Sequence, residues 1–288
     1  MEYGTHLPII ALDNRPFSLA LLREYTVATL ELGYSFLCAN DTLLFPRPWL
    51  DGPTALASVI GQSGDLTLVT TVSLPVLRGP VPMSKTLAAL DVLSGGRLIA
   101  GVGSGSSEED YATIGIPFSQ RWRRFDESVM TLRSLLNQKE EPFEGSYYST
   151  NSSHLEPYPI QKYGLPIWLG TWGSEAGLQR TAKLADGWIA SAFNTTADEF
   201  KQKADRLNIL LQLEGKDPNK FPNALATMFM HISDSSEESE RIPREVLSPA
   251  LGRSGDELVD QLLLGPPEVC AEKLSKLQSA GVQRVFLW

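Results

Sequence analysis

The residues best placed to do chemistry gather around a glycine-rich loop, Gly101-Val-Gly-Ser-Gly105. The apolar run Leu98–Val102 leads into it, and Glu108-Glu109-Asp110 follows. Glycine lets the backbone approach a ligand closely, and α/β folds bind ligands in loops at the carboxyl ends of strands. The dinucleotide fingerprint G-x-G-x-x-G needs a third glycine where this chain has Ser106 or Glu108, so a Rossmann site is not indicated. A loop that needs glycine only to turn is the alternative.

A second candidate is the stretch Gly170-Thr-Trp-Gly-Ser174, which joins a predicted strand to a helix beginning at Ser174. Free backbone N–H groups and the helix dipole favour an anion at such a position, so the stretch predicts a phosphate site. An ordinary N-cap explains the same residues.

Acid–base candidates are few, because the chain has three histidines. His6 falls at the amino end of the predicted first strand, where a structural role is expected. His154 lies in a predicted insertion, and His231 at the carboxyl end of a strand, where it could transfer a proton or simply be structural. Asp13 and Asp41 also follow predicted strands. Each could be an acid–base group, a hydrogen-bond partner of a cofactor, or a simple turn residue.

No Ser-His-Asp set, HExxH or metal-spaced Cys/His cluster is found in the sequence. We therefore predict no metal site and no protein nucleophile, which favours an organic cofactor.

The composition excludes several classes of protein. The 288 residues carry a net charge of −9 with no basic block, which argues against nucleic-acid binding. Cys38 and Cys270 lie far apart in apolar or helical contexts, as expected for free thiols in a reducing compartment. There is no secretory signal pattern, and no apolar run reaches the roughly 20 residues that span a bilayer. A cytoplasmic protein is expected.

Eight apolar runs read as strands, separated by helical patterns at roughly 30-residue spacing. The predicted strands are 7–12, 34–39, 66–73, 98–102, 166–171, 187–191, 225–232 and 284–288. This order predicts one (β/α)₈ TIM barrel over residues 1–288, with an insertion at 140–165 between strands 4 and 5, read as a small hairpin. The sequence ends at the eighth strand, so no closing helix is predicted. Subunit contacts or an altered barrel end are expected there, because an uncovered eighth strand would expose apolar surface.

The intervening helices are predicted at 17–32, 52–62, 84–93, 121–138, 174–185, 198–214 and 267–280. Asp198 is the predicted cap of its helix, and Ser254-Gly-Asp-Glu257 fits a capping box. The prolines at 75, 80 and 82 predict a loop, and the polar run Ser233–Arg241 predicts another.

Longer motifs resemble the bacterial luciferase-like monooxygenase family. They are the block from Thr86 to Gly105, Pro166-Ile-Trp-Leu-Gly170 with Leu184-Ala-Asp-Gly-Trp188, and the block from Gly265 to Val285. The resemblance implies a barrel that binds FMN, or the deazaflavin coenzyme F420, at the carboxyl ends of its strands. FMN members receive reduced flavin from a partner reductase and use O₂, whereas F420 members move a hydride directly.

The resemblance also implies site residues. Those expected to flank the ring are Asn40, Asp41, Thr71, Val72 and Ser73, with a non-proline cis peptide at Val72–Ser73. Those expected along the tail are Ser104, Ser106 and Glu109. Those expected at the phosphate are Gly170, Thr171, Trp172, Gly173 and Ser174. Phe45, Trp49 and Trp172 are candidate pocket walls, or helix-packing residues. Many members have Asp-His where this chain has Asn40-Asp41, and Gly-Trp where it has Gly105-Ser106.

The resulting interpretation is a flavin-dependent enzyme, a monooxygenase oxidising a small organic substrate with reduced FMN and O₂. Asp41 and His231 are its candidate catalytic residues. Alternatives are an F420-dependent dehydrogenase or reductase, a flavin-binding protein without turnover and, last, a phosphosugar lyase. A flavin reductase is the expected partner, and a homodimer the expected assembly.

Overall fold

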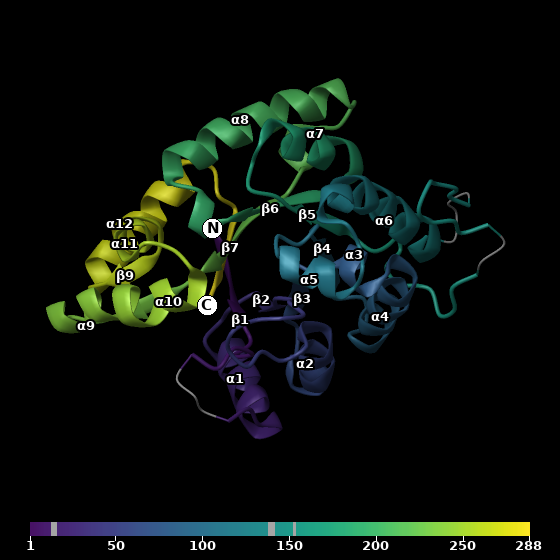
Figure 1. Cartoon of the computed structure of the whole chain (residues 1–288). Helices are drawn as coiled ribbons and strands as arrows, with labels where there is room; N and C mark the ends of the chain where they lie inside the picture. The colour runs from purple at the N-terminus through teal and green to yellow at the C-terminus, as the bar shows by residue number, and fades with distance from the viewer. Residues whose placement is uncertain (13–15, 138–141, 152–153) are drawn as a thin grey trace.

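The computed structural model describes residues 1–12, 16–137, 142–151 and 154–288. Eight parallel strands close into a barrel in the order β1-β10-β7-β6-β5-β4-β3-β2, and helices surround it (Figure 1). The predicted (β/α)₈ barrel is therefore confirmed. Its strands are β1 Glu2–His6, β2 Phe36–Ala39, β3 Thr67–Thr70, β4 Leu98–Val102, β5 Ile167–Gly170, β6 Gly187–Ser191, β7 Asn223–Met228 and β10 Arg284–Leu287.

The longer helices fall close to the predicted ranges. They are α1 Leu19–Glu31, α2 Gly52–Val59, α4 Pro80–Leu93, α6 Arg121–Leu136, α7 Glu175–Leu184, α8 Ala197–Leu213 and α12 Pro267–Ser279. Shorter elements are α3 Pro75–Arg78, α5 Glu108–Thr113, α9 Ser236–Arg241, α10 Ser248–Leu251, α11 Gly255–Gln261, a π-helix at Ile242–Leu247, β8 Met230–Ile232 and β9 Leu263–Gly265. Among the described helices, none is long and apolar enough to cross a membrane.

The first strand lies earlier than predicted. β1 is Glu2–His6, and it pairs with both β10 and β2. The apolar run at 7–12 instead follows the strand, where Leu7 and Ile9 are fully buried. The apolar residues of this run are buried without forming a strand. The more polar residues before the run form the strand, because they pair with a neighbouring strand on each side. His6 is therefore at the carboxyl end of β1, and its predicted place at the amino end is wrong.

Large and small side chains alternate inside the barrel. Phe36, Trp168 and Phe286 are buried there. A Cβ on Gly4 would lie 2.6 Å from the Cβ of Phe36, and a Cβ on Gly187 2.6 Å from the Trp168 ring. The interior is consequently a packed core, as barrels of this size require, and the space for a ligand lies beyond the strand ends.

Replacing Gly187 by alanine tests this packing. The new methyl group would meet the rigid Trp168 ring, so we expect the free energy of unfolding to fall by about 1–3 kcal/mol. Urea denaturation measures the change. Gly61→Ala is the matched control, because no atom lies within 4 Å of the added Cβ, and it should change the stability by less than about 0.5 kcal/mol. Equal stability of the two variants would contradict the packing argument.

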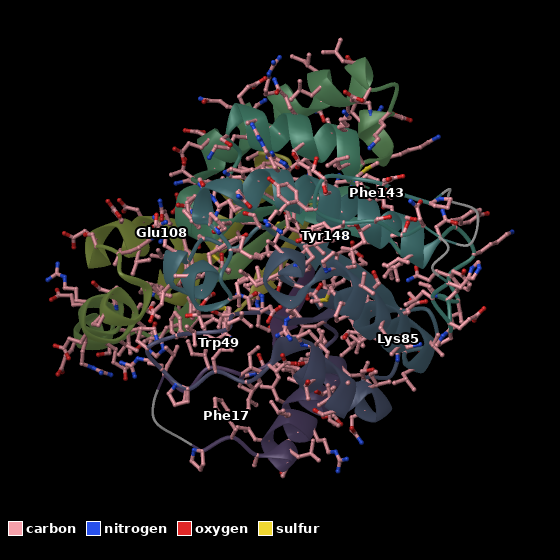
Figure 2. The ribbon with its side chains drawn as sticks, turned by 45° about the vertical axis from the view of Figure 1, so that its right-hand side comes forward. Phe17, Trp49, Lys85, Glu108, Phe143 and Tyr148 are labelled. Atoms are coloured by element: carbon pink, nitrogen blue, oxygen red, sulfur yellow. The ribbon has the colours of Figure 1, made fainter. Side chains whose placement is uncertain are left out.

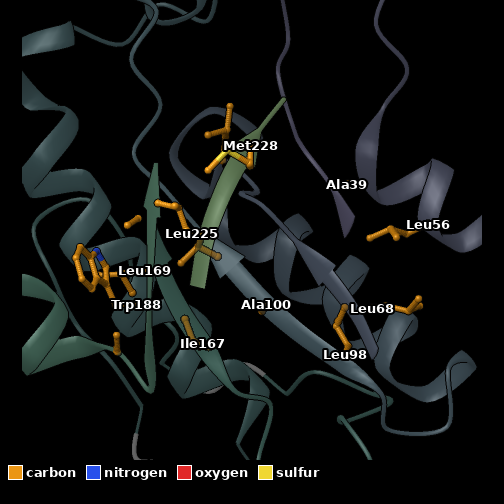
Figure 3. Packing of buried hydrophobic residues seen from close by; sticks show 14 of the residues in the cluster. Ala39, Leu56, Leu68, Leu98, Ala100, Ile167, Leu169, Trp188, Leu225 and Met228 are labelled. Carbon is orange, nitrogen blue, oxygen red and sulfur yellow. The ribbon is translucent and has the colours of Figure 1, made fainter. Parts of the chain in front are cut away.

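A second apolar layer joins the barrel to its helices. Figure 3 shows it around Leu68, Leu98, Ala100, Ile167 and Trp188, all of which are buried. Outward side chains of β10 belong to the same layer, and Val285 and Leu287 are 0% and 6% exposed. The apolar side chains of the eighth strand are therefore covered within the chain.

Residues 230–265 form a small unit between β7 and α12. β8 and β9 pair in parallel, and α9, the π-helix, α10 and α11 lie between them in the chain. The predicted seventh strand is thus two strands, β7 and β8, of which only β7 belongs to the barrel. The loop predicted at Ser233–Arg241 contains α9, whose first turn is capped by the Ser235 side chain.

Three local predictions about helix starts were wrong. Pro75 and Pro80 open α3 and α4, because proline fits the first helical turn, where its missing N–H costs nothing. Thr196, not Asp198, caps α8, in a capping box with Glu199. Ser254 precedes α11 as predicted, but its side chain makes no capping hydrogen bond.

The predicted insertion is described only in part, because residues 140–141 and 152–153 lie outside the described residues. One antiparallel bridge joins Glu144 and Ser149. The buried Asp91 carboxylate accepts hydrogen bonds from the Ile160 N–H and the Gln161 amide, which fixes the later part of the segment against the end of α4.

Candidate active site at the carboxyl ends of the strands

Every barrel strand brings a residue to one rim of the barrel. The residues at, next to or just beyond the strand ends are His6, Asn40, Thr71, Gly103, Gly170, Ser191, Thr227 and Trp288. Parallel strands place their carboxyl ends on the same side, so residues far apart in the sequence become neighbours there. The set is polar or small, except for Trp288.

His6, Thr71 and Asn40 form one hydrogen-bonded chain across β1, β2 and β3. His6 Nε2 lies 2.8 Å from Thr71 Oγ1, which in turn lies 2.8 Å from Asn40 Oδ1. His6 Nδ1 lies 3.1 Å from the Leu287 carbonyl oxygen. Two predicted cofactor residues, Asn40 and Thr71, are thus joined to a histidine that the sequence had assigned to the opposite rim.

The His6 imidazole is buried and stacks on the Trp288 indole, with ring centroids 4.5 Å apart and planes 12° from parallel. Burial lowers the pKa of His6 from 6.5 to about 4, although the Leu287 carbonyl and Asn40 act in the opposite direction. The imidazole is therefore neutral near neutral pH.

This lowered pKa makes stability depend on pH. The unfolded chain binds a proton at His6 near pH 6.5, but the folded protein does so only near pH 4, so protonation favours unfolding between these values. We expect the stability advantage of the wild type over His6→Gln to shrink by about 3 kcal/mol as the pH falls from 6.5 to 4. Urea denaturation across this range measures it, with the exposed His154→Gln as the control. A constant difference would contradict a buried neutral His6.

Val72 lies among the ends of β3, β4 and β5. The non-proline cis peptide is Thr71–Val72, so the prediction of Val72–Ser73 was wrong by one residue. A Cβ on Gly103 or on Gly170 would lie 2.5 or 2.7 Å from Val72 side-chain atoms. Glycine at these two positions therefore lets Val72 sit against uncovered backbone.

Asp41 is already paired. Its carboxylate is 1% exposed, accepts from Arg78 Nε at 2.6 Å and also accepts from the Leu74 N–H. Arg78 reaches Asp51 as well. Hydrogen bonding to Asp41 raises the pKa of Arg78 further, so this guanidinium stays charged. Through these contacts Asp41 holds the loop after β2 against α3. Its catalytic role stays a prediction.

Contacts with α5 hold the glycine-rich loop in place. The buried Tyr111 hydroxyl donates to the Ser104 carbonyl oxygen, and Ser104 itself is buried. The Asp110 carboxylate accepts from the Leu44 N–H and so ties α5 to the loop after β2; burial raises the pKa of this carboxyl group. Ser106 and Glu109 remain exposed above these anchors, where a ligand could reach them.

The stretch from Gly170 to Ser174 leads into α7 as predicted. The Ser174 side chain accepts from the Gly177 N–H, and Gly173 has φ +81°, which favours glycine. Trp172 is exposed. Glu175, in the first turn, hydrogen-bonds to Arg206, which lowers its pKa and offsets its charge beside this helix end.

An aromatic cluster covers the side of the rim next to His6. Trp288 stacks on Phe229 at 5.1 Å and meets the edge of Trp49 at 5.4 Å. Phe45 packs against Trp49, and Phe193 against Phe229. Trp49, labelled with Glu108 in Figure 2, comes from the loop after β2. Phe45 and Trp49 were predicted as walls, whereas Trp288, Phe229 and Phe193 were missed.

His231 does not join this group. It lies on β8, opposite Leu264 of β9, and its Nε2 is 3.4 Å from a carboxylate oxygen of Glu238. Asp13 lies outside the described residues. In the parts of the chain that the structure describes, no cluster of His, Cys, Asp and Glu is arranged to hold a metal ion.

Residues 2–284 match the sequence profile of the luciferase-like monooxygenases. The chain belongs to this family. Luciferase-like monooxygenase relatives include an FMNH₂-dependent dimethylsulfone monooxygenase of Pseudomonas putida, 27% identical over 62% of this chain and 48% of that protein. Another is an F420-dependent glucose-6-phosphate dehydrogenase of Microbacterium testaceum, 28% identical over 59% of this chain and 52% of that one.

The chain spans about half the length of the curated relatives it matches. A solved F420-dependent secondary alcohol dehydrogenase superposes over 99% of this chain and 92% of its own, with a TM-score of 0.85 at 15% identity. At this identity the superposition shows the luciferase-like fold and no more.

Proposed function

We propose that this protein is a flavin-dependent monooxygenase that oxidises a small organic substrate with reduced FMN and O₂. Family membership supports flavin chemistry, and the FMNH₂-dependent relative supports this choice among the family's reactions. The observation that carries the proposal is the rim itself, where polar and small residues from eight strands meet beside an aromatic wall.

Buried polar atoms at the rim fit a ring-shaped cofactor. Trp49 Nε1 and Ser73 Oγ are both buried, and neither has a hydrogen-bond partner within the described residues. Unpaired buried polar atoms are costly, so they are expected where a ligand or water completes the structure. The uncovered backbone at Gly103 and Gly170 beside Val72 is a second feature that suits a flat ligand.

In this proposal each part of the rim has one task. Asn40, Thr71, Val72 and Ser73 flank the ring, while Ser104, Ser106 and Glu109 line the tail. The backbone from Gly170 to Ser174, with Thr171, Trp172 and Gly173, receives the phosphate at the start of α7.

The bound reduced flavin supplies the electrons for the reaction with O₂. The chain's own residues orient it and exclude water from the reacting face, mainly through Phe45, Trp49 and Phe229. Neutral His6 holds the Thr71 hydroxyl in place. A partner flavin reductase, a homodimer and a cytoplasmic location also remain proposals.

The second candidate is an F420-dependent dehydrogenase or reductase, favoured by the F420-dependent relative of similar identity. Side-by-side assays separate the two. We expect substrate-dependent O₂ consumption when FMN, a reductase and NADH are supplied, and no substrate-dependent change of F420 absorbance. Turnover with F420 alone would replace the monooxygenase proposal, and turnover with neither cofactor over a broad substrate panel would contradict both.

A further inference from the structure

We propose that His6 is a positioning residue that sets, through the Thr71 hydroxyl, which end of the Asn40 carboxamide faces the active site. The hydrogen-bond argument concerns the protein alone. Its consequence for the cofactor rests on the proposed function.

Three contacts join four groups in a line. They link the Leu287 carbonyl oxygen to His6 Nδ1 at 3.1 Å, His6 Nε2 to Thr71 Oγ1 at 2.8 Å, and Thr71 Oγ1 to Asn40 Oδ1 at 2.8 Å. Each contact needs one proton to be a hydrogen bond. A neutral imidazole supplies one and the Thr71 hydroxyl another, so with Oδ1 facing Thr71 the line lacks one proton.

Two changes supply the missing proton: protonation of His6, or a half-turn of the Asn40 carboxamide that brings Nδ2 to Thr71. Burial disfavours the imidazolium, as the lowered pKa indicates. A neutral imidazole protonated at Nε2 would instead leave two acceptors, Nδ1 and the Leu287 oxygen, facing each other inside the protein, which is costly.

One arrangement therefore satisfies all groups near neutral pH. His6 Nδ1–H donates to Leu287, the Thr71 hydroxyl donates to His6 Nε2, and Asn40 Nδ2–H donates to Thr71. Asn40 is half-buried, and its second carboxamide atom is the one that does not face Thr71. That atom is then Oδ1, an acceptor, so the site favours an N–H group of the cofactor at this point. Protonation of His6 reverses the carboxamide and presents a donor.

In the described parts of the chain, no other group around His6 is placed to set the orientation of the Asn40 carboxamide by changing its charge near neutral pH. On β2, burial raises the pKa of the Cys38 thiol well above its usual value, so the thiol stays neutral. Asp41, next to Asn40, is paired with Arg78. β3 contributes Thr71, and β10 is followed by the uncharged Trp288. Within the described residues, none of the influences on the His6 pKa comes from a charged side chain.

Nitrogen NMR of the imidazole tests the arrangement directly. The chain has three histidines, so His6 is the one histidine that remains in the double variant His154→Gln/His231→Gln. Neither substitution lies at the rim or in the core. In uniformly ¹⁵N-labelled protein we expect the Nδ1–H tautomer at neutral pH, with Nε2 as a hydrogen-bonded acceptor. The Nε2–H tautomer, or an imidazolium at neutral pH, would overturn the inference.

A second measurement tests the coupling through Thr71. Asn40→Asp offers only acceptors to Thr71, so the line then requires a protonated His6, and the pKa of His6 should rise by about 1–3 units. In a Thr71→Val background, which removes the linking hydroxyl, the same change should shift this pKa by less than half as much. Equal shifts in both backgrounds would show that His6 senses only charge, and the inference would fail.

Cofactor titration of the wild-type protein, beside the tautomer measurement, separates this inference from the proposed function. The Nε2–H tautomer in a protein that still binds FMN would overturn the inference alone. Binding of neither FMN nor F420 by a protein with the expected tautomer would count against the proposed function alone.

Discussion

Replacing Arg78 by methionine is expected to lower the free energy of unfolding by about 3–5 kcal/mol. The reason is the partner left behind, because the Asp41 carboxylate is 1% exposed and, of its partners within the described residues, would keep only the Leu74 N–H. Breaking a buried ion pair from one side leaves a charge without compensation, which costs far more than losing an exposed pair. Urea denaturation at neutral pH measures the change.

Two further variants complete this test. Lys201→Met removes an exposed helical pair with Asp205, whose side chains are 60% and 62% exposed, and should cost less than about 0.5 kcal/mol. The double variant Asp41→Leu/Arg78→Met should be more stable than Arg78→Met, because no charge is then left uncompensated. If Arg78→Met and Lys201→Met lowered the free energy of unfolding equally, the Asp41–Arg78 pair would not hold the loop after β2 against α3. Retained turnover in the double variant would exclude a catalytic role for Asp41.

Replacing Gly173 by valine is expected to weaken cofactor binding tenfold or more, a change of about 1.4 kcal/mol. Gly173 has φ +81°, which a β-branched residue tolerates poorly, and an added side chain would overlap the Lys203 stem. The backbone must then rearrange where the N–H groups before α7 are proposed to hold the phosphate. Fluorescence titration with FMN measures the affinity.

Gly215→Val is the control for this variant. Gly215 has nearly the same conformation, φ +74°, at the end of α8, and no atom lies within 4 Å of an added Cβ. Both variants should lose about 1–2 kcal/mol of stability from backbone strain, but only Gly173→Val should lose affinity. Equal affinities in the two variants would place the phosphate elsewhere.

The elements that the sequence predicted well have a strong local signal. Leu98–Val102 is a short apolar run between two glycine turns, and it is β4 to the residue. Arg121–Leu136 has a clear helical stripe and is α6. The first strand failed because its residues are mixed in polarity, and pairing with both β10 and β2 makes them a strand. The pairing with β10 joins residues more than 280 positions apart, which no local pattern contains.

The candidate site divides in the same way. Asn40 and Thr71 could be found from the family resemblance. The loops after β4 and β5 could be found from their glycines, because backbone that approaches a ligand closely needs glycine. His6 was misplaced by the error in the first strand. Trp288 meets His6 only because β1 and β10 close the barrel, so their stacking depends on closure and not on any sequence pattern.

The most direct test of the central claim is titration of the purified protein with FMN and, separately, with F420, following ring fluorescence. We predict saturable binding of FMN that is weakened in Gly103→Leu, where the added side chain would displace Val72 at the rim. Gly61→Ala, remote from the rim, should bind as the wild type does. Preference for F420 would favour the alternative proposal, an F420-dependent dehydrogenase or reductase that uses the same site for hydride transfer. Binding of neither cofactor, or FMN binding unchanged in Gly103→Leu, would contradict the site described here.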